Sequence, residues 1–129
     1  EDSIFEGHVN VARRNRGCLR YSSIPSGCRT PRRYQCQPDL AEAAAGNDVA
    51  LRRLAADRVR PQFASTVYAT PAYARLAPTC DAHIRRGASD GGEMGVFHDL
   101  HEPERAQLLG QLLDEHTPAD VDTGLILIA

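Results

Sequence analysis

Four residues that break regular secondary structure crowd into the segment 25–38. They are Pro25, Gly27, Pro31 and Pro38. Proline has no backbone N–H to donate and fixes φ, so this segment excludes a helix and most pairing within a sheet. We therefore expect a stiff, extended arm over residues 25–39. The arm separates a β-forming start from a helical remainder, and it presents arginines with little backbone entropy left to lose.

The chain before this arm alternates in polarity with the period of a β-strand. One alternating stretch contains Phe5, Gly7, Val9 and Val11, and a second runs from residue 18 to residue 23. Between them, residues 13–17 contain Asn and Gly, which favour a turn. Two strands are therefore expected within residues 3–24. They form either an antiparallel hairpin or one coil of a right-handed parallel solenoid, whose coils run to roughly twenty residues.

The remainder of the chain carries helical patterns. Asn47 or Asp48 can cap a helix over residues 48–59, which has to end before Pro61. Pro103 and a stripe of leucines predict a helix over residues 102–116. Weaker patterns predict a strand at 62–68, short helices at 72–76 and 79–84, and a closing strand at 124–129. The expected class is α+β, with a terminal β-solenoid coil or strand pair at 1–24 and an α+β cap domain at 25–129.

The charges are distributed unevenly along the chain. All fifteen basic residues are arginine; residues 1–36 carry a net charge of +4 and residues 87–129 a net charge of −8, within a total of −2. Guanidinium groups pair bidentately with carboxylates, so this placement predicts pairing of the two ends, within the domain or with a neighbour. It argues against nucleic acid, although Tyr21 and Tyr34 interleave the arginines as a base-stacking surface would.

Cysteine and histidine residues are the candidate metal ligands. The four cysteines form no C-x-x-C pair, so they are expected to be buried thiols, or a disulfide joins Cys18 or Cys28 to Cys36. A zinc site could use Cys80, His83, His98 and His101, because each pair has the i, i+3 spacing of one helical face. In the alternative, Cys80 packs as an apolar side chain and the histidines are surface residues. No cofactor is expected.

Catalytic motifs are sparse. The glycine-rich segment 89–95 lacks the Lys and Ser/Thr of a P-loop and contains Asp90 and Glu93, which would repel phosphate. No serine stands in a G-x-S-x-G elbow, so an enzyme is disfavoured. The longest apolar run, residues 125–129, is too short to cross a bilayer, which predicts a soluble protein. The chain opens at Glu1 without an initiator Met or a secretory signal, as a fragment or processed piece would.

Two blocks of the sequence resemble a known family. The first contains Cys18, Arg20, Tyr21, Pro25, Gly27, Arg29, Thr30, Pro31, Arg32, Arg33, Tyr34, Cys36, Gln37, Pro38 and Asp39. The second runs from Arg60 to Leu100 and includes Phe63, Tyr68, Tyr73, Cys80, Gly87, Met94 and His98. Both are similar to the C-terminal region of large bacterial proteins of uncharacterised function, which have upstream β-solenoid-like repeats and are encoded near phage-tail-like or contractile-injection components. The chain departs from that pattern at Ser26 and Cys28.

The resemblance implies a non-enzymatic structural or docking role. It favours the solenoid coil over the hairpin, with helices 48–59 and 102–116 covering the end of the solenoid. It implies Cys18, Cys36 and Cys80 as structural cysteines, with Cys28 as a spare thiol. The expected interaction residues are Arg20, Arg29, Arg32, Arg33 and Tyr34.

The partners implied are other protein subunits or the rest of the parent chain, in the bacterial cytoplasm or within a phage-tail-like particle. Two alternatives stay open at this point. One is a nucleic-acid-binding module that uses the arginine-rich arm, and the other is a metal-dependent enzyme that uses Cys80, His83, His98 and His101.

Overall fold

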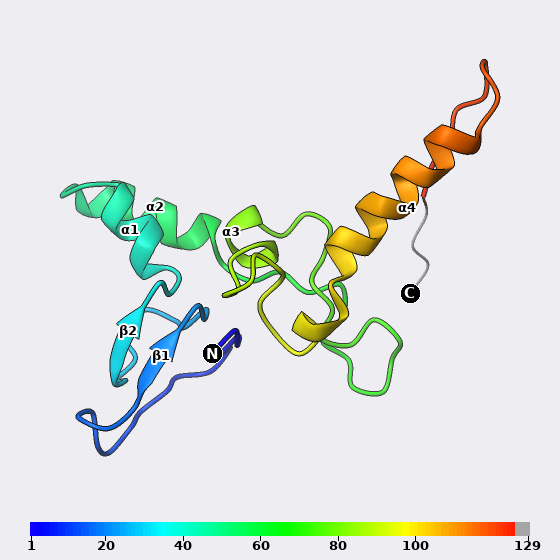
Figure 1. The fold of residues 1–129 in the computed structure, drawn as a ribbon. Coiled ribbons are helices and arrows are strands. Elements are labelled where there is room, and N and C mark those ends of the chain that lie inside the picture. The colour runs from blue at the N-terminus through cyan, green and yellow to red at the C-terminus, as the bar shows by residue number, and fades with distance from the viewer. Residues whose placement is uncertain (126–129) are drawn as a thin grey trace.

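The computed structural model describes residues 1–125 and shows a mixed architecture (Figure 1). Its strands are β1 (Cys18–Arg20) and β2 (Arg32–Tyr34), which form a parallel pair. Its helices are α1 (Asp39–Ala44), α2 (Val49–Arg58), α3 (Ala82–Arg85), the short 3-10 helix η1 (His98–Leu100) and α4 (Glu102–His116). The α+β class predicted from the sequence is therefore confirmed. The closing strand predicted at 124–129 falls mostly on residues 126–129, which lie outside the described residues.

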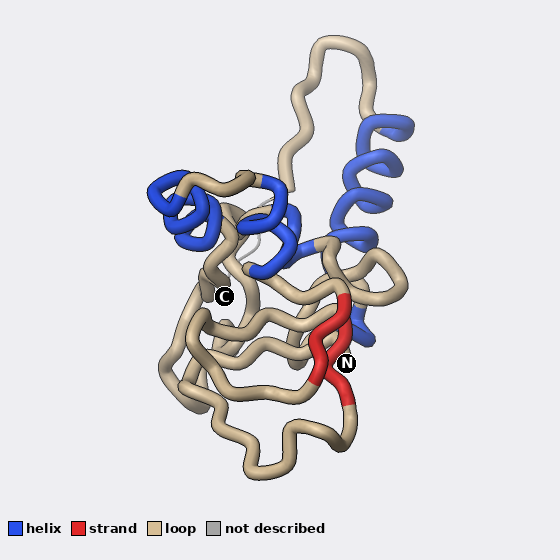
Figure 2. The backbone as a smooth tube through the Cα atoms, turned by 90° about the vertical axis from the view of Figure 1, so that its left-hand side faces the viewer, coloured by secondary structure: helices blue, strands red, loops and turns tan. Residues whose placement is uncertain are grey.

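The first 38 residues wind so that successive segments stack in parallel (Figure 2). Ile4 pairs with Ser23, and Ser23 pairs in turn with Gln37. The Ser23 amide donates to the Ser3 carbonyl at 2.9 Å, and the Gln37 amide donates to the Ser22 carbonyl at 3.0 Å. We call residues 2–20 the first rung and residues 21–34 the second rung; residues 35–38 begin a third. The antiparallel hairpin is therefore wrong, because all of these pairings are parallel.

The two rungs differ in length at one corner. Asn10 pairs with Arg29, nineteen residues further on, whereas Cys18 pairs with Arg32, fourteen residues further on. The first rung uses residues 11–17 to pass from one paired position to the next, while the second needs only Thr30 and Pro31. The arginine-rich turn at residues 13–17 is therefore an insertion that protrudes from a fourteen-residue rung.

The prediction that the arm at 25–39 excludes most pairing within a sheet is also wrong. Residues 29, 32–34 and 37 within it pair with the first or second rung, and α1 begins at Asp39. Proline does not prevent this pairing, because Pro25 and Pro31 fall between paired positions, where no ladder N–H is needed.

Two groups of buried side chains hold the molecule together. Inside the rungs, Ser22, Ile24, Thr30 and Cys36 are almost fully buried. The second group consists of Cys80, Ile84, Ala88 and Met94, against which Ile4 of the first rung and Leu76 pack. Ile4 therefore joins the rungs to the segment 76–94.

The helix predicted at 48–59 is confirmed as α2, and Asp48 caps it by accepting from the Ala50 amide at 2.8 Å. Helices α1 and α2 pack against each other and lie above the coils in Figure 2. A pocket between α2 and both rungs is lined by Phe5, Ile24 and Val59, so α2 lies beside the two rungs. The prediction for 79–84 is confirmed in part as α3, which starts later, after the capping residue Asp81.

The helix predicted at 102–116 is confirmed as α4, with the same bounds. It projects away from the rungs (Figure 1), so the expectation that it covers them is wrong. Its leucine stripe is largely exposed, and an ion pair from Arg75 to Glu102, at 2.8 Å, anchors its first turn.

The strand predicted at 62–68 and the helix predicted at 72–76 do not form. Instead, residues 72–76 turn back onto residues 62–65 through isolated bridges, such as Phe63 with Leu76. Within the described part of the chain, no helix has the length and apolar character needed to cross a membrane.

Candidate functional site

The two short strands display the predicted interaction residues on opposite sides. In β1 and β2 the outer residues of each strand are exposed and the central residue is half-buried. Because side chains alternate along a strand, Arg20, Arg32 and Tyr34 point outward, and Arg33 points toward the interior. Arg29 is also exposed, beside Asn10 of the first rung. The structure therefore brings four of the five predicted residues to the surface and separates the fifth from them.

Arg20 lies over two tyrosine rings. Its guanidinium carbon is 5.8 Å from the ring centroid of Tyr21 and 5.6 Å from that of Tyr34, and the two rings meet edge to face. On the other side of Arg20, the Glu1 carboxylate lies 3.8 Å from Nε. Arg20 stands directly opposite Tyr34 in the parallel register. This stack engages the Tyr34 ring, which leaves it poorly placed to receive a nucleic-acid base.

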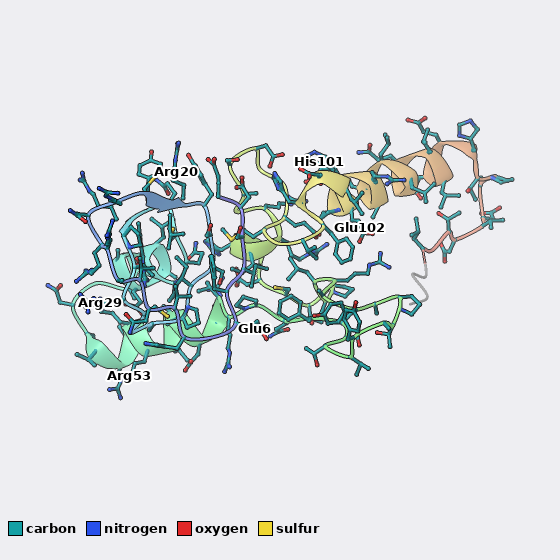
Figure 3. All side chains as sticks on the ribbon, turned by 90° about the horizontal axis from the view of Figure 1, so that it is seen from below. Glu6, Arg20, Arg29, Arg53, His101 and Glu102 are labelled. Atoms are coloured by element: carbon teal, nitrogen blue, oxygen red, sulfur yellow. The ribbon has the colours of Figure 1, made fainter. Side chains whose placement is uncertain are left out.

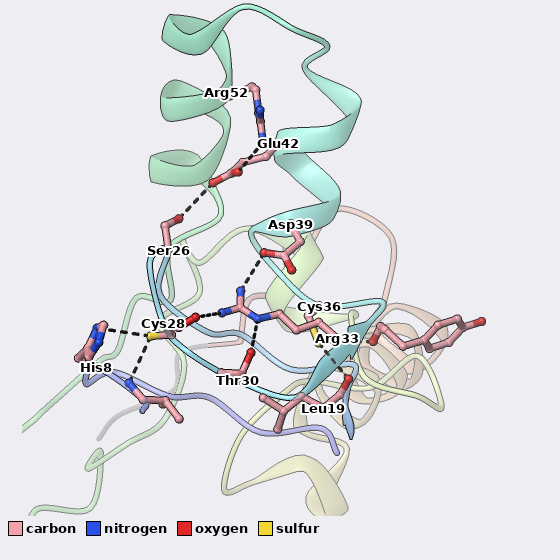
Figure 4. A network of polar contacts seen from close by, with 12 residues as sticks. His8, Leu19, Ser26, Cys28, Thr30, Arg33, Cys36, Asp39, Glu42 and Arg52 are labelled. Atoms are coloured by element: carbon pink, nitrogen blue, oxygen red, sulfur yellow. Dashed lines mark hydrogen bonds and ion pairs between the residues drawn. The ribbon is translucent and has the colours of Figure 1, made fainter. Parts of the chain in front are cut away.

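Arg33 is held by three groups around the second rung (Figure 4). Its Nε donates to Thr30 Oγ1 at 2.8 Å, its Nη2 donates to the Cys28 carbonyl at 3.2 Å, and its Nη1 pairs with Asp39 at 2.9 Å. Its side chain is only 16% exposed. These contacts indicate a structural role for Arg33, and its role as an interaction residue stays a prediction.

The contacts of Arg33 fall at the edge of the rung stack. The Arg29 amide and carbonyl bond to Val9 and Val11 of the first rung, so the Cys28 and Thr30 carbonyls point the other way. A guanidinium group donates to each of these carbonyls. Arg33 Nη2 donates to the Cys28 carbonyl and Arg14 Nε donates to the Thr30 carbonyl, both at 3.2 Å. Side chains therefore occupy the hydrogen-bonding positions that a further strand would use.

The opposite edge of the stack has no such cover at Asn10. The Asn10 amide and carbonyl make no hydrogen bond within residues 1–125. As strands, β1 and β2 pair only with each other over these residues, and on its other side β1 is met by the Asp2 amide, which donates to the Arg20 carbonyl at 3.2 Å. The two edges therefore differ at Asn10 and Arg29, where one edge is bare and the other has its carbonyls covered.

The four predicted metal ligands do not form one site. Cys80 lies in the buried group with Ile84 and Met94, and its Sγ accepts from the Gln62 amide at 3.4 Å. Burial raises the pKa of the Cys80 thiol, which opposes the thiolate form that a zinc ion needs. His83 is exposed and bonds Asp81 through Nδ1 at 2.7 Å.

His98 and His101 face a different set of groups. His98 Nδ1 lies 3.0 Å from the Glu93 carbonyl, while its Nε2 lies 3.9 Å from Asp2 and 3.7 Å from Asp90. His101 Nε2 is 3.8 Å from Asp90. Across residues 1–125, no group of three or more His, Cys, Asp or Glu side chains has an arrangement that could hold a metal ion.

The charge of His98 follows from this geometry. Burial disfavours the cation, but the hydrogen bond to the Glu93 carbonyl and the carboxylates of Asp90, Asp2 and Asp99 outweigh it and raise the pKa of His98. The same contacts join the first rung to the segment 89–101, because Asp2 also accepts from the Ser89 amide at 2.6 Å and the Ser89 hydroxyl at 2.8 Å.

All four cysteines are free thiols, so the alternative of a disulfide is wrong, and the expectation of buried thiols is confirmed for Cys36 and Cys80 only. Cys36 is buried inside the rungs, where its Sγ lies 3.5 Å from the Leu19 carbonyl. Cys18 is exposed on β1, in line with Arg32. Cys28 Sγ accepts from the Val9 amide at 3.2 Å, so this thiol links the second rung to the first.

The sequence alone does not predict the covered edge or the contacts of Arg33 with Thr30 and Asp39. A repeat search that allowed a five-residue insertion could have found the rungs, since Ser3, Ser22 and Cys36 occupy equivalent positions. Comparison of the chain with protein-family models, with curated proteins and with solved structures finds no match.

Proposed function

We propose that this chain is a non-enzymatic structural module that ends a parallel β-solenoid. In this proposal residues 1–38 are the last rungs, and α1 and α2 with the Arg33 network form the cap. The partner of the edge that is bare at Asn10 is the rest of a parent chain or another protein subunit. The resemblance to bacterial proteins encoded near phage-tail-like or contractile-injection components suggests the assembly in which such a cap would serve.

The observation that carries this proposal is the difference between the two edges of the stack. A solenoid exposes unpaired strand edges at its last rung, and these edges recruit further chains unless they are covered. Here Arg33 and Arg14 take the carbonyls of one edge, at Cys28 and Thr30, while the other edge at Asn10 is left unpaired within residues 1–125. A terminal module needs this asymmetry, since it has to join rungs on one side and stop them on the other.

The asymmetry can be tested by fusion. A regular parallel β-solenoid from which the terminal cap has been removed serves as the host, and the full chain is joined to its exposed last rung through Glu1. Because the edge that is bare at Asn10 then faces the host, we expect a soluble monomer by size-exclusion chromatography with light scattering, whereas the uncapped host aggregates.

The matched control joins the same two parts in the reverse order, so that the host follows residue 129. There the host's exposed last rung stays uncovered at the far end of the fusion, so aggregation should persist. If the forward fusion aggregates as much as the reverse fusion, the cap proposal fails.

A further inference from the structure

Five arginines gather at the inserted corner of the first rung and the matching corner of the second. We call Arg13, Arg14, Arg16, Arg29 and Arg32 the arginine corner. All five side chains are exposed. None of them forms an ion pair within residues 1–125, where the ion-paired arginines are Arg20, Arg33, Arg52, Arg58 and Arg75.

The arginine corner is a compact surface, because the two rungs stack in register on both sides of it. The pairs Asn10 with Arg29 and Cys18 with Arg32 bracket the corner. Neighbouring strands lie about 4.8 Å apart, so guanidinium groups on adjacent rungs are close enough to repel one another. Arg14 also spans the rungs through its bond to the Thr30 carbonyl. A rigid group of like charges is stabilised when an anionic partner binds it.

A complementary surface lies at the end of α4. We call Asp114, Glu115, Asp120 and Asp122 the acidic tip. All four are exposed, and none forms an ion pair within residues 1–125. Thr123 ties the tip together by donating to Asp114 Oδ1 at 2.8 Å.

The acidic residues of the last turn of α4 are placed against the helix dipole. A helix C-terminus carries partial negative charge, so Asp114 and Glu115 add to that potential instead of neutralising it. The only basic residue of the last turn is His116. Their position is unfavourable for the isolated helix and favourable for binding a cation.

The two surfaces cannot meet within one molecule in this structure. The rungs and the far end of α4 lie at opposite ends of the molecule (Figure 1), and Arg20 and Arg29 lie at the end away from α4 (Figure 3). The expected pairing of the two ends within the domain is therefore not present among the described residues. We propose that the arginine corner of one copy binds the acidic tip of a second copy.

Charge and chemistry favour a second copy over nucleic acid as the partner. Arginine forks bind carboxylates bidentately, and the chain supplies exposed carboxylates of its own. The whole molecule is net negative, with −8 in residues 87–129, which repels a polyanion approaching that end. The Tyr34 ring next to the arginines already contacts Arg20 and the edge of the Tyr21 ring, so a base that stacked on it would compete with these contacts.

A contact between two different surfaces is heterologous, so it propagates into open chains or closes into a ring. The inference does not depend on the cap proposal, which concerns the backbone edge at Asn10. Each can fail without the other.

Sedimentation velocity of the full chain tests the inference. We expect concentration-dependent association at about 50 mM NaCl that weakens at least tenfold at about 500 mM, because exposed ion pairs are screened. The corner variant Arg13→Glu/Arg16→Glu/Arg29→Glu and the tip variant Glu115→Arg/Asp120→Arg/Asp122→Arg should each be monomeric. A 1:1 mixture of the two should associate again, because each supplies the surface that the other has reversed.

The matched control is Arg53→Glu/Arg60→Glu/Arg86→Glu, which changes the net charge equally but lies outside the arginine corner. It should retain the association. A wild-type chain that stays monomeric at low salt, a control that loses association as fully as the corner variant, or a mixture that stays monomeric would each overturn the proposal. Salt-sensitive binding of a DNA duplex by wild type, lost in the corner variant, without self-association, would assign the corner to nucleic acid instead.

Discussion

Arg32 and Arg33 are neighbours in β2 with opposite surroundings, which makes them a matched pair for mutation. Arg33→Ala leaves the Cys28 carbonyl and the Thr30 hydroxyl without a donor. The ion pair with the half-exposed Asp39 adds little. We expect Arg33→Ala to lower the free energy of unfolding by about 2 kcal/mol and Arg32→Ala to change it by less than about 0.5 kcal/mol, measured by urea denaturation. Equal effects would show that Arg33 does not close the edge.

His98 gives the contact between the first rung and the segment 89–101 a dependence on pH. A carbonyl cannot donate, so the neutral ring keeps its proton on Nδ1 toward Glu93 and leaves Nε2 bare against Asp2 and Asp90. Protonation at Nε2 removes this repulsion. The pKa of His98 is raised in the folded state, so its contribution to stability is fully present below about pH 6.5 and is lost as the pH rises through the folded-state pKa.

The difference in unfolding free energy between wild type and His98→Asn should therefore shrink from pH 6 to pH 8. Asparagine keeps a donor for the Glu93 carbonyl but cannot take up a proton. His8→Asn, at an exposed histidine with no ion pair within residues 1–125, is the control. If the stability difference between wild type and His98→Asn grows with pH, protonation of His98 does not stabilise the folded state.

At the scale of elements, the sequence predicts where helices begin, because helix starts depend on residues within one turn of the chain. Asp48 and Pro103 mark the starts of α2 and α4, because capping and proline preferences act within one turn of the chain. The position of α4 does not follow from its leucine stripe. An apolar face shows that a helix can pack, but it does not identify the surface against which the helix packs. Helix α1 was missed although it begins directly after Pro38 with Asp39 and Glu42, which suit a helix N-terminus.

The rungs could be predicted only in part, because their pairing depends on the path of the chain. Alternation marks the strands, and the resemblance pointed to a parallel solenoid coil. The segments that pair are fixed by the length of each circuit, nineteen residues from Asn10 to Arg29 and fourteen from Cys18 to Arg32. The unequal corners hide this repeat from a simple period search. Without the pairing, the prolines at the corners suggest a connector between domains. In the same way, Arg33 is taken for a surface residue, because the sequence does not show the groups to which it donates.

At the scale of the whole molecule, the described residues form a short parallel stack whose edges differ, covered at Cys28 and Thr30 and bare at Asn10. Helices α1 and α2 lie above the strands, and the acidic α4 projects away from them (Figure 1). The central claim is that the stack is a true solenoid, which predicts that a complete rung can be added without disturbing its neighbours.

Insertion of a second copy of residues 21–34 directly after Tyr34 tests this claim. The added fourteen residues form one full rung, so each side chain keeps its face and α1 still follows residue 38. Insertion of residues 21–27 alone adds half a rung and shifts the register. We predict that the full-rung variant melts cooperatively at or above the wild-type temperature by circular dichroism, with more β-structure, and that the half-rung variant does not fold. If the two insertions destabilise the chain equally, residues 2–38 are not solenoid rungs.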